Sequence, residues 1–141
     1  MRVRSAITWM IIAIVVAVAF LALDLVWITL VAGPAFMAAF GDTMLESPRA
    51  GAALAFYGLY VFGLCFFAVA PALRTGRVAM AAGYGALLGL VAYGTFDLTV
   101  LAILKPATTQ LAVMDMAWGS FVSAASASAG AWVGTRRLVV S

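Results

Sequence analysis

Three aspartates stand inside long apolar stretches, and they are the residues of this sequence best placed to do chemistry. Asp24, Asp97 and Asp115 are each flanked on both sides by runs of aliphatic and aromatic residues. A charged side chain at the centre of a membrane span costs about 2.5–3.5 kcal/mol on insertion scales, so each aspartate is expected to face the protein interior or water. There, a carboxyl group can fix helix packing, bind a cation or proton, or act as an acid or base.

Aromatic residues with polar groups accompany these aspartates. Trp27 and Trp118 each stand three residues after an aspartate, and Tyr93 stands four residues before one. This spacing places each aromatic on the same helix face as its aspartate. Tryptophan and tyrosine can donate a hydrogen bond to a carboxylate while their rings stay in apolar surroundings. We therefore predict an outward-facing acidic and aromatic pocket, formed by Asp24, Trp27, Tyr57, Tyr60, Tyr93, Asp97, Lys105, Asp115 and Trp118.

Three roles for this pocket are open from the sequence. The aspartates can hydrogen-bond neighbouring helices and fix their packing. They can form a binding site for a lipid head group, a small cation or a proton. A carboxylate pair can also do acid–base catalysis on a lipid-soluble substrate. The Gly-x-Gly-Asp motif of intramembrane aspartyl proteases is absent, because Val113-Met114 precedes Asp115 and Thr95-Phe96 precedes Asp97.

The leading functional hypothesis is a non-enzymatic membrane protein that binds or moves a lipid or small amphiphile at the pocket. The first alternative is an accessory or structural subunit of a larger membrane complex, with the aspartates purely structural. The second alternative is an enzyme of membrane-lipid modification.

Composition narrows the chemistry further. The sequence has no histidine, which excludes haem ligation by histidine, histidine general bases and the usual zinc sites. Carboxylates alone favour hard cations such as Mg²⁺, but no second cluster of oxygen ligands is visible, so no metal or cofactor is predicted. The single cysteine, Cys65, cannot form an intrachain disulfide. The formal charge of +3 is scattered between apolar runs, so nucleic-acid binding is not expected.

The elements that position these residues are predicted to be membrane-spanning helices. Of 141 residues, 67% are apolar and 9% are charged, and the mean hydropathy is +1.17. Ordinary soluble domains carry about 25% charged residues. A spanning helix needs about 20 mostly apolar residues. We predict a single membrane domain over residues 1–141, an all-α bundle of four transmembrane helices at about 6–31, 49–73, 78–104 and 110–134.

Positive charge predicts the orientation of these helices. Only Arg49 and Lys105 fall at one end of the predicted bundle. The positive-inside rule therefore places both termini in the cytoplasm, in a multi-pass protein of the bacterial inner membrane. The apolar run after the N-terminal arginines is too long for a signal peptide, so a retained first helix is expected. The other basic residues fall at the opposite end: Arg2, Arg4, Arg74, Arg77, Arg136 and Arg137.

Residues 32–48 form the only long connection between the predicted helices. Phe36, Met37, Phe40 and Met44 stand there at helical spacing. The pattern favours a short helix lying on the outer membrane surface, and an ordinary loop packed over the bundle is the alternative.

Small residues fall in rows along the third and fourth predicted helices. Such rows let helices approach closely in lipid. They indicate packing within one bundle or, alternatively, against a larger membrane complex or a second copy of the chain. Membrane lipids are the other predicted partner. The predicted packing residues are Gly85, Gly89, Gly119, Ser126, Gly130 and Gly134.

Four segments carry a resemblance to a known family: residues 23–27 (LDLVW), 55–60 (AFYGLY), 93–99 (YGTFDLT) and 113–119 (VMDMAWG). The chain resembles small predicted bacterial membrane proteins grouped as a domain of unknown function. The resemblance implies four spans and a bacterial source. It also implies a loose link to membrane-lipid modification, because relatives are often encoded beside lipid methyltransferases and flavin oxidoreductases. The chain departs from the family pattern at Val100, where many members carry asparagine, and no family activity carries over.

Overall fold

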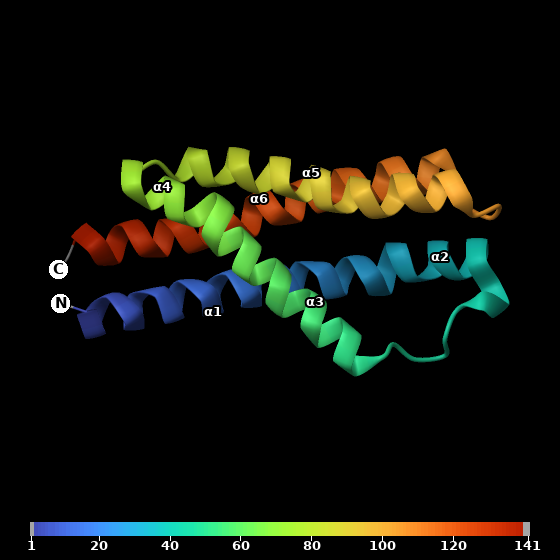
Figure 1. Ribbon diagram of the computed structural model, residues 1–141, viewed down its shortest axis with the longest axis horizontal. Helices are drawn as coiled ribbons and strands as arrows, with labels where there is room; N and C mark the ends of the chain where they lie inside the picture. The colour runs from blue at the N-terminus through green and yellow to red at the C-terminus, as the bar shows by residue number, and fades with distance from the viewer. Residues whose placement is uncertain (1, 140–141) are drawn as a thin grey trace.

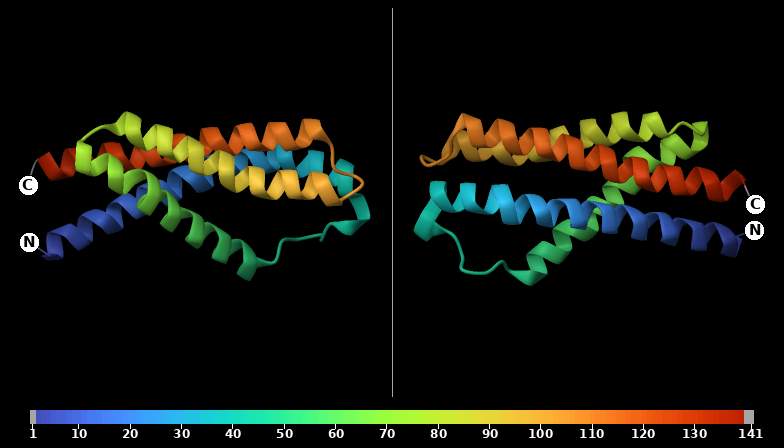
Figure 2. Two further views of the ribbon diagram at one scale, coloured as in Figure 1. Left: turned by 45° about the horizontal axis from the view of Figure 1, so that its top comes forward. Right: turned by 180° about the vertical axis from the view of Figure 1, so that it is seen from behind.

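The computed structural model describes residues 2–139, and within that range the chain is helical with no strand. The all-α prediction is confirmed. Three long rods lie side by side in Figures 1 and 2, whereas α3 crosses them diagonally and diverges toward its N-terminal end. Both termini lie at the end of the bundle that also holds the turn between α4 and α5. The helices are α1 (Arg2–Trp27), α2 (Gly33–Phe40), α3 (Ala50–Gly63), α4 (Ala70–Thr75), α5 (Val78–Ile103) and α6 (Thr109–Val139).

Three helical segments of the described chain are long and apolar enough to cross a membrane. They are Ala6–Thr43, Ala50–Thr75 and Val78–Ile103. The sequence predicted four spans, and α6 is the helix outside this set. It has ample length at 31 residues, but serines and glycines lower its hydropathy. Its serine hydroxyl groups are hydrogen-bonded within the protein: the Ser126 hydroxyl, for example, donates to the Val122 carbonyl at 2.7 Å.

The first span continues further than predicted. A π-helical segment, η1 (Ile28–Ala32), joins α1 to α2, and a 3-10 turn, η2 (Gly41–Thr43), ends it. The helix expected on the outer surface is instead α2, which prolongs α1 (Figure 2). Pro34 has no N–H and normally interrupts an α-helix. Here the π-helical segment changes the spacing of the hydrogen bonds just before it, and the Gly33 N–H donates to the Ile28 carbonyl five residues back.

The second span also has a π-helical segment just before a proline. A π-helical segment, η3 (Leu64–Val69), precedes α4 and its Pro71. The N–H of Ala70 donates to the carbonyl of Cys65, again five residues back. Both prolines are thus accommodated inside long helices, and α3, η3 and α4 form one span rather than separate pieces.

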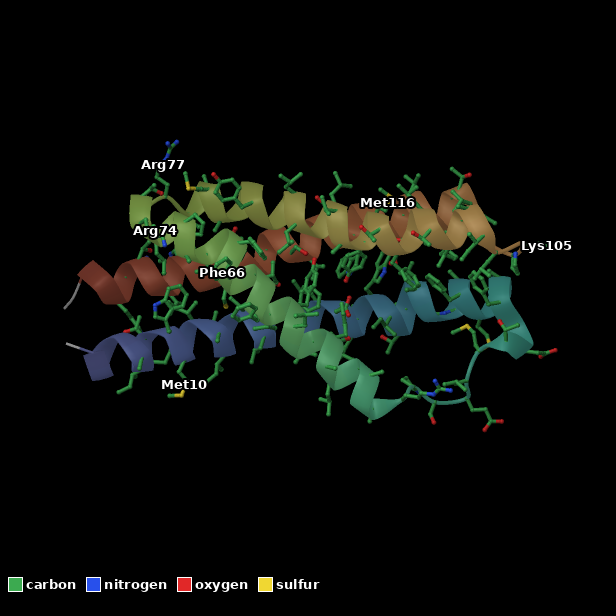
Figure 3. All side chains as sticks on the ribbon, viewed as in Figure 1. Met10, Phe66, Arg74, Arg77, Lys105 and Met116 are labelled. Carbon is green, nitrogen blue, oxygen red and sulfur yellow. The ribbon has the colours of Figure 1, made fainter. Side chains whose placement is uncertain are left out.

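The apolar core occupies the half of the bundle that holds the termini. Its large fully buried side chains come from α1, η3 and α6: Ile12, Val16, Phe20, Leu64, Val69 and Val122. Figure 3 shows Arg74 and Arg77 at this end and Lys105 at the opposite end. The buried aspartates therefore lie beyond the core, in the half where α3 diverges from the other helices.

Small residues lie where helices meet inside the bundle. An added Cβ at Gly85 would be 2.7 Å from the Ser123 carbonyl oxygen, and one at Gly89 would meet the Gly119 carbonyl oxygen. These contacts allow α5 and α6 to pack backbone against backbone, as small residues permit in membranes. The remaining predicted packing residues also lie in the interior: Gly119 against Tyr93, Gly130 against Val16, Gly134 against Leu73 and Ile12, and Ser126 fully buried.

Candidate functional site

Asp24 joins α1 to three other helices. Its side chain is only 4% exposed. The Tyr57 hydroxyl of α3 donates to Oδ2 at 2.9 Å. The Tyr93 hydroxyl of α5 and the Trp118 indole of α6 both donate to Oδ1, each at 3.3 Å. Three donors complement the acceptor capacity of a carboxylate. Asp24 is therefore the polar centre of the helix packing, as in the first of the roles considered from the sequence.

Asp24-x-x-Trp27 on α1 and Asp115-x-x-Trp118 on α6 form a reciprocal pair. The Trp27 indole donates to Oδ1 of Asp115 at 2.9 Å, while Trp118 donates to Asp24. The two indole rings stack, with centroids 4.7 Å apart and planes 3° from parallel. Because α1 and α6 run in opposite directions (Figure 1), the two motifs face each other head to tail. Each tryptophan thereby satisfies the aspartate of the other helix.

Asp97 and Asp115 have fewer partners than Asp24. Asp97 is 3% exposed, and its buried Oδ2 has no hydrogen-bond partner within the described chain. Asp115 accepts the Trp27 bond at Oδ1, and its Oδ2 has no partner among the described residues. The two carboxyl groups lie close enough to interact electrostatically. Buried polar groups are nearly always paired, so an unpaired carboxyl oxygen calls for an explanation.

A partly open cavity of about 490 Å³ adjoins this layer. Its surface is mostly apolar, and the residues with polar groups among its lining are Asp24, Asp115, Trp27, Tyr60 and Tyr93. Phe56 and Tyr60 bring α3 into the lining, and Figures 1 and 2 show that this helix diverges from the others toward its N-terminal end. The volume of the cavity is in the range of small-molecule sites, about 300–1,000 Å³. The rest of its lining is apolar: Ile28, Ala32, Gly33, Phe36, Met44, Phe56, Ala92 and Phe96.

The other predicted pocket residues lie around the cavity rather than in its wall. Tyr57 and Trp118 donate hydrogen bonds to Asp24, and Asp97 is within electrostatic range of Asp115. Lys105 is exposed at the far end of α5 (Figure 3) and does not line the cavity. The structure thus brings the aspartates and aromatics together and leaves the lysine apart. Ligand binding by these residues stays a prediction.

The apolar wall was not identified from the sequence. Phe36, Phe56 and Phe96 come from α2, α3 and α5. Phe36 and Phe96 approach each other with ring centroids 6.3 Å apart, so they link α2 to α5. Helical spacing placed Phe36 on a helix, but nothing in the sequence indicates how far α3 tilts away. That tilt leaves the space between these rings and Phe56.

Among the described residues, the site contains no set of side chains arranged to coordinate a metal ion. No group of three or more histidine, cysteine, aspartate or glutamate side chains is arranged there to hold a metal ion. The buried polar contacts of the layer come instead from tyrosine and tryptophan. A further buried polar contact joins Tyr60 and Ser123, whose hydroxyl oxygens are 2.7 Å apart.

One family model matches the chain over most of its length. The model is described as "Predicted membrane protein (DUF2177)" and covers residues 9–132. The matched range contains the three aspartates and the four segments singled out in the sequence. No curated protein and no solved structure matches the chain.

Proposed function

The chain belongs to the DUF2177 family of predicted membrane proteins, as its sequence resemblance indicated, and we propose that it binds a lipid or small amphiphile within the membrane. The cavity carries the proposal. Its surface is mostly apolar, and the carboxyl-bearing residues Asp24 and Asp115 contribute to one part of the lining. An amphiphile has the same division, with a polar head and an apolar chain. The divergence of α3 leaves the cavity beside a helix face that lipid would surround.

The proposal includes α6 as a fourth span. At about 1.5 Å per residue, its 31 residues measure about 46 Å, more than the roughly 30 Å hydrocarbon core. It runs antiparallel to α5 and forms close backbone contacts with it. Its serines and glycines contact other helices, so its low hydropathy reflects a central position in the bundle.

The proposed orientation places both termini in the cytoplasm of a bacterium. Arg74 and Arg77 lie at the end of the bundle that holds the termini, and Lys105 lies at the other end. Arg136 also lies at the terminal end, over the Trp132 ring at 4.1 Å. Arginine gathered at one end is typical of the cytoplasmic side of an inner-membrane protein. The cavity then lies in the outer half of the membrane.

A docking role for the small-residue rows receives less support. Gly130 and Gly134 contact Val16, Ile12 and Leu73 of the same chain, and Ser126 is fully buried. These faces are occupied inside the bundle and offer no free surface to a partner. We therefore favour amphiphile binding over an accessory role that uses those residues.

Filling the cavity with Ala92→Phe is expected to release a bound amphiphile. Ala92 lines the cavity, so a phenyl ring there takes up part of its space. We expect native mass spectrometry after mild detergent extraction to show a ligand on the wild-type protein, with retention falling about ten-fold in the variant, equivalent to about 1.4 kcal/mol.

Ala102→Phe is the matched control for this experiment. Ala102 lies on the same helix but is exposed and away from the cavity. Equal retention in both variants would contradict the proposal. A chemically altered amphiphile whose formation depends on Asp97 would instead support the enzymatic interpretation.

A further inference from the structure

The charged groups that line the cavity are all of one sign. Asp24 and Asp115 are in its wall, and no lysine or arginine is among its lining residues. Arg49 and Lys105, the two basic residues predicted at one end of the bundle, are exposed and outside the lining. Asp97, which does not line the cavity, adds a third carboxyl group within electrostatic range of Asp115. The cavity therefore has an uncompensated capacity for positive charge.

The three aspartates differ in how many hydrogen bonds their carboxyl oxygens accept from the protein. Both oxygens of Asp24 accept hydrogen bonds from the protein. In Asp115, only Oδ1 does so, and Oδ2 has no partner among the described residues. The buried Oδ2 of Asp97 likewise has none. Asp115 lines the cavity and Asp97 does not, so a ligand that donates hydrogen bonds would meet a free acceptor at Asp115, and an anionic head would offer it no donor.

Aromatic rings form another part of the lining. Trp27, Tyr60 and Tyr93 line the cavity next to the carboxyl groups. The faces of such rings attract cations, and the attraction increases when the cation is desolvated. Carboxyl oxygens beside aromatic faces are a combination that suits an alkylammonium group.

From these three observations we propose that the cavity selects an amphiphile with a cationic amine head, which it places at Asp115 with its chain along Phe36, Phe56 and Phe96. This inference rests on the proposed function, because it names the ligand class of the same cavity. The amine supplies the donors that Oδ2 of Asp115 lacks, and the apolar wall covers the chain. An anionic phosphate or carboxylate head lacks this complementarity.

The test compares four probes on the full chain in phosphatidylcholine nanodiscs: dodecylamine, dodecanol, dodecanoate and ethylamine. At pH 7 the amines are protonated, because alkylamines titrate near pH 10. Binding is measured by calorimetry, with empty nanodiscs as the blank. We expect dodecylamine to bind about ten-fold tighter than dodecanol, dodecanoate to bind most weakly of the three, and ethylamine, which lacks a chain, not to compete.

Asp115→Asn is expected to abolish the preference for dodecylamine while dodecanol binding persists, which also shows that the variant is folded. Asp42→Asn removes the same charge from an exposed position outside the cavity and is expected to keep the preference. Equal binding of amine and alcohol to the wild-type protein would overturn the inference, as would a preference that survives Asp115→Asn. Effective competition by ethylamine would assign the site to a soluble amine and also overturn it. If no dodecyl probe binds at all, the proposed function itself fails.

Discussion

Gly89→Ala is expected to destabilise the protein by about 2–3 kcal/mol, the cost of overpacking a close contact. The added methyl group would meet the Gly119 carbonyl oxygen and lie 2.6 Å from the Ser123 hydroxyl oxygen. Backbone atoms cannot move aside as a flexible side chain can, so α5 and α6 would have to separate. Unfolding by sodium dodecyl sulfate, followed by circular dichroism, measures the effect.

Gly83→Ala supplies the matched control on the same helix. Gly83 is exposed, and nothing lies within 4 Å of a Cβ placed there. Because alanine favours helix more than glycine does, this variant is expected to be at least as stable as the wild-type protein. If the two variants unfold at the same detergent concentration, that result would contradict the close approach of α5 and α6 at Gly89.

Asp24→Leu is expected to be more damaging still. The substitution leaves the Tyr57 and Tyr93 hydroxyls and the Trp118 indole without their acceptor. Each buried donor left unpaired costs about 1–3 kcal/mol, so a total above about 3 kcal/mol is expected. Asp24→Asn keeps one carbonyl acceptor and should lose less. Unfolding titrations of the purified variants in the same detergent provide the comparison.

Asp97→Leu tests whether the loss at Asp24 comes from its hydrogen bonds. Both aspartates are almost fully buried, but Oδ2 of Asp97 has no partner within the described chain. The Asp97→Leu substitution therefore breaks few hydrogen bonds, and it removes the free-energy cost of burying an unpaired polar group. We expect its stability to equal or exceed that of the wild-type protein. Equal losses for Asp24→Leu and Asp97→Leu would contradict the central role of Asp24.

The sequence anticipated the helical fold and the gathering of polar groups because both follow from local spacing. Apolar runs of spanning length indicated membrane helices. The three-residue spacing from Asp24 to Trp27 and from Asp115 to Trp118 indicated that each pair shares a helix face. The reciprocal exchange of hydrogen bonds between these pairs depends on how α1 and α6 meet, which a single sequence does not encode locally.

Other features depended on irregular helix geometry. The first helix was predicted to end at about residue 31, three residues before Pro34, whereas the π-helical segment before this proline lets the helix continue to Thr43. The tilt of α3, which creates the cavity, has no local signal. Lys105 was grouped with the aspartates because it was predicted at the same end of the bundle, and that position does not say which way a side chain points.

The three aspartates are chemically distinct in the folded protein, although the sequence presented them alike. Asp24 accepts three hydrogen bonds and links four helices. Asp115 has one oxygen engaged and lines the cavity. Asp97 is buried with an unpaired oxygen. We infer a structural role for the first and a ligand-facing role for the second.

The most direct test of amphiphile binding is a crystal structure of the full chain grown in a lipid mesophase. We predict elongated density in the cavity, with its polar end at Asp24 and Asp115 and its chain between Phe36 and Phe56. A cavity that holds only water, or one closed by movement of α3 toward α5 with lipid confined to the outer surface, would contradict the proposal.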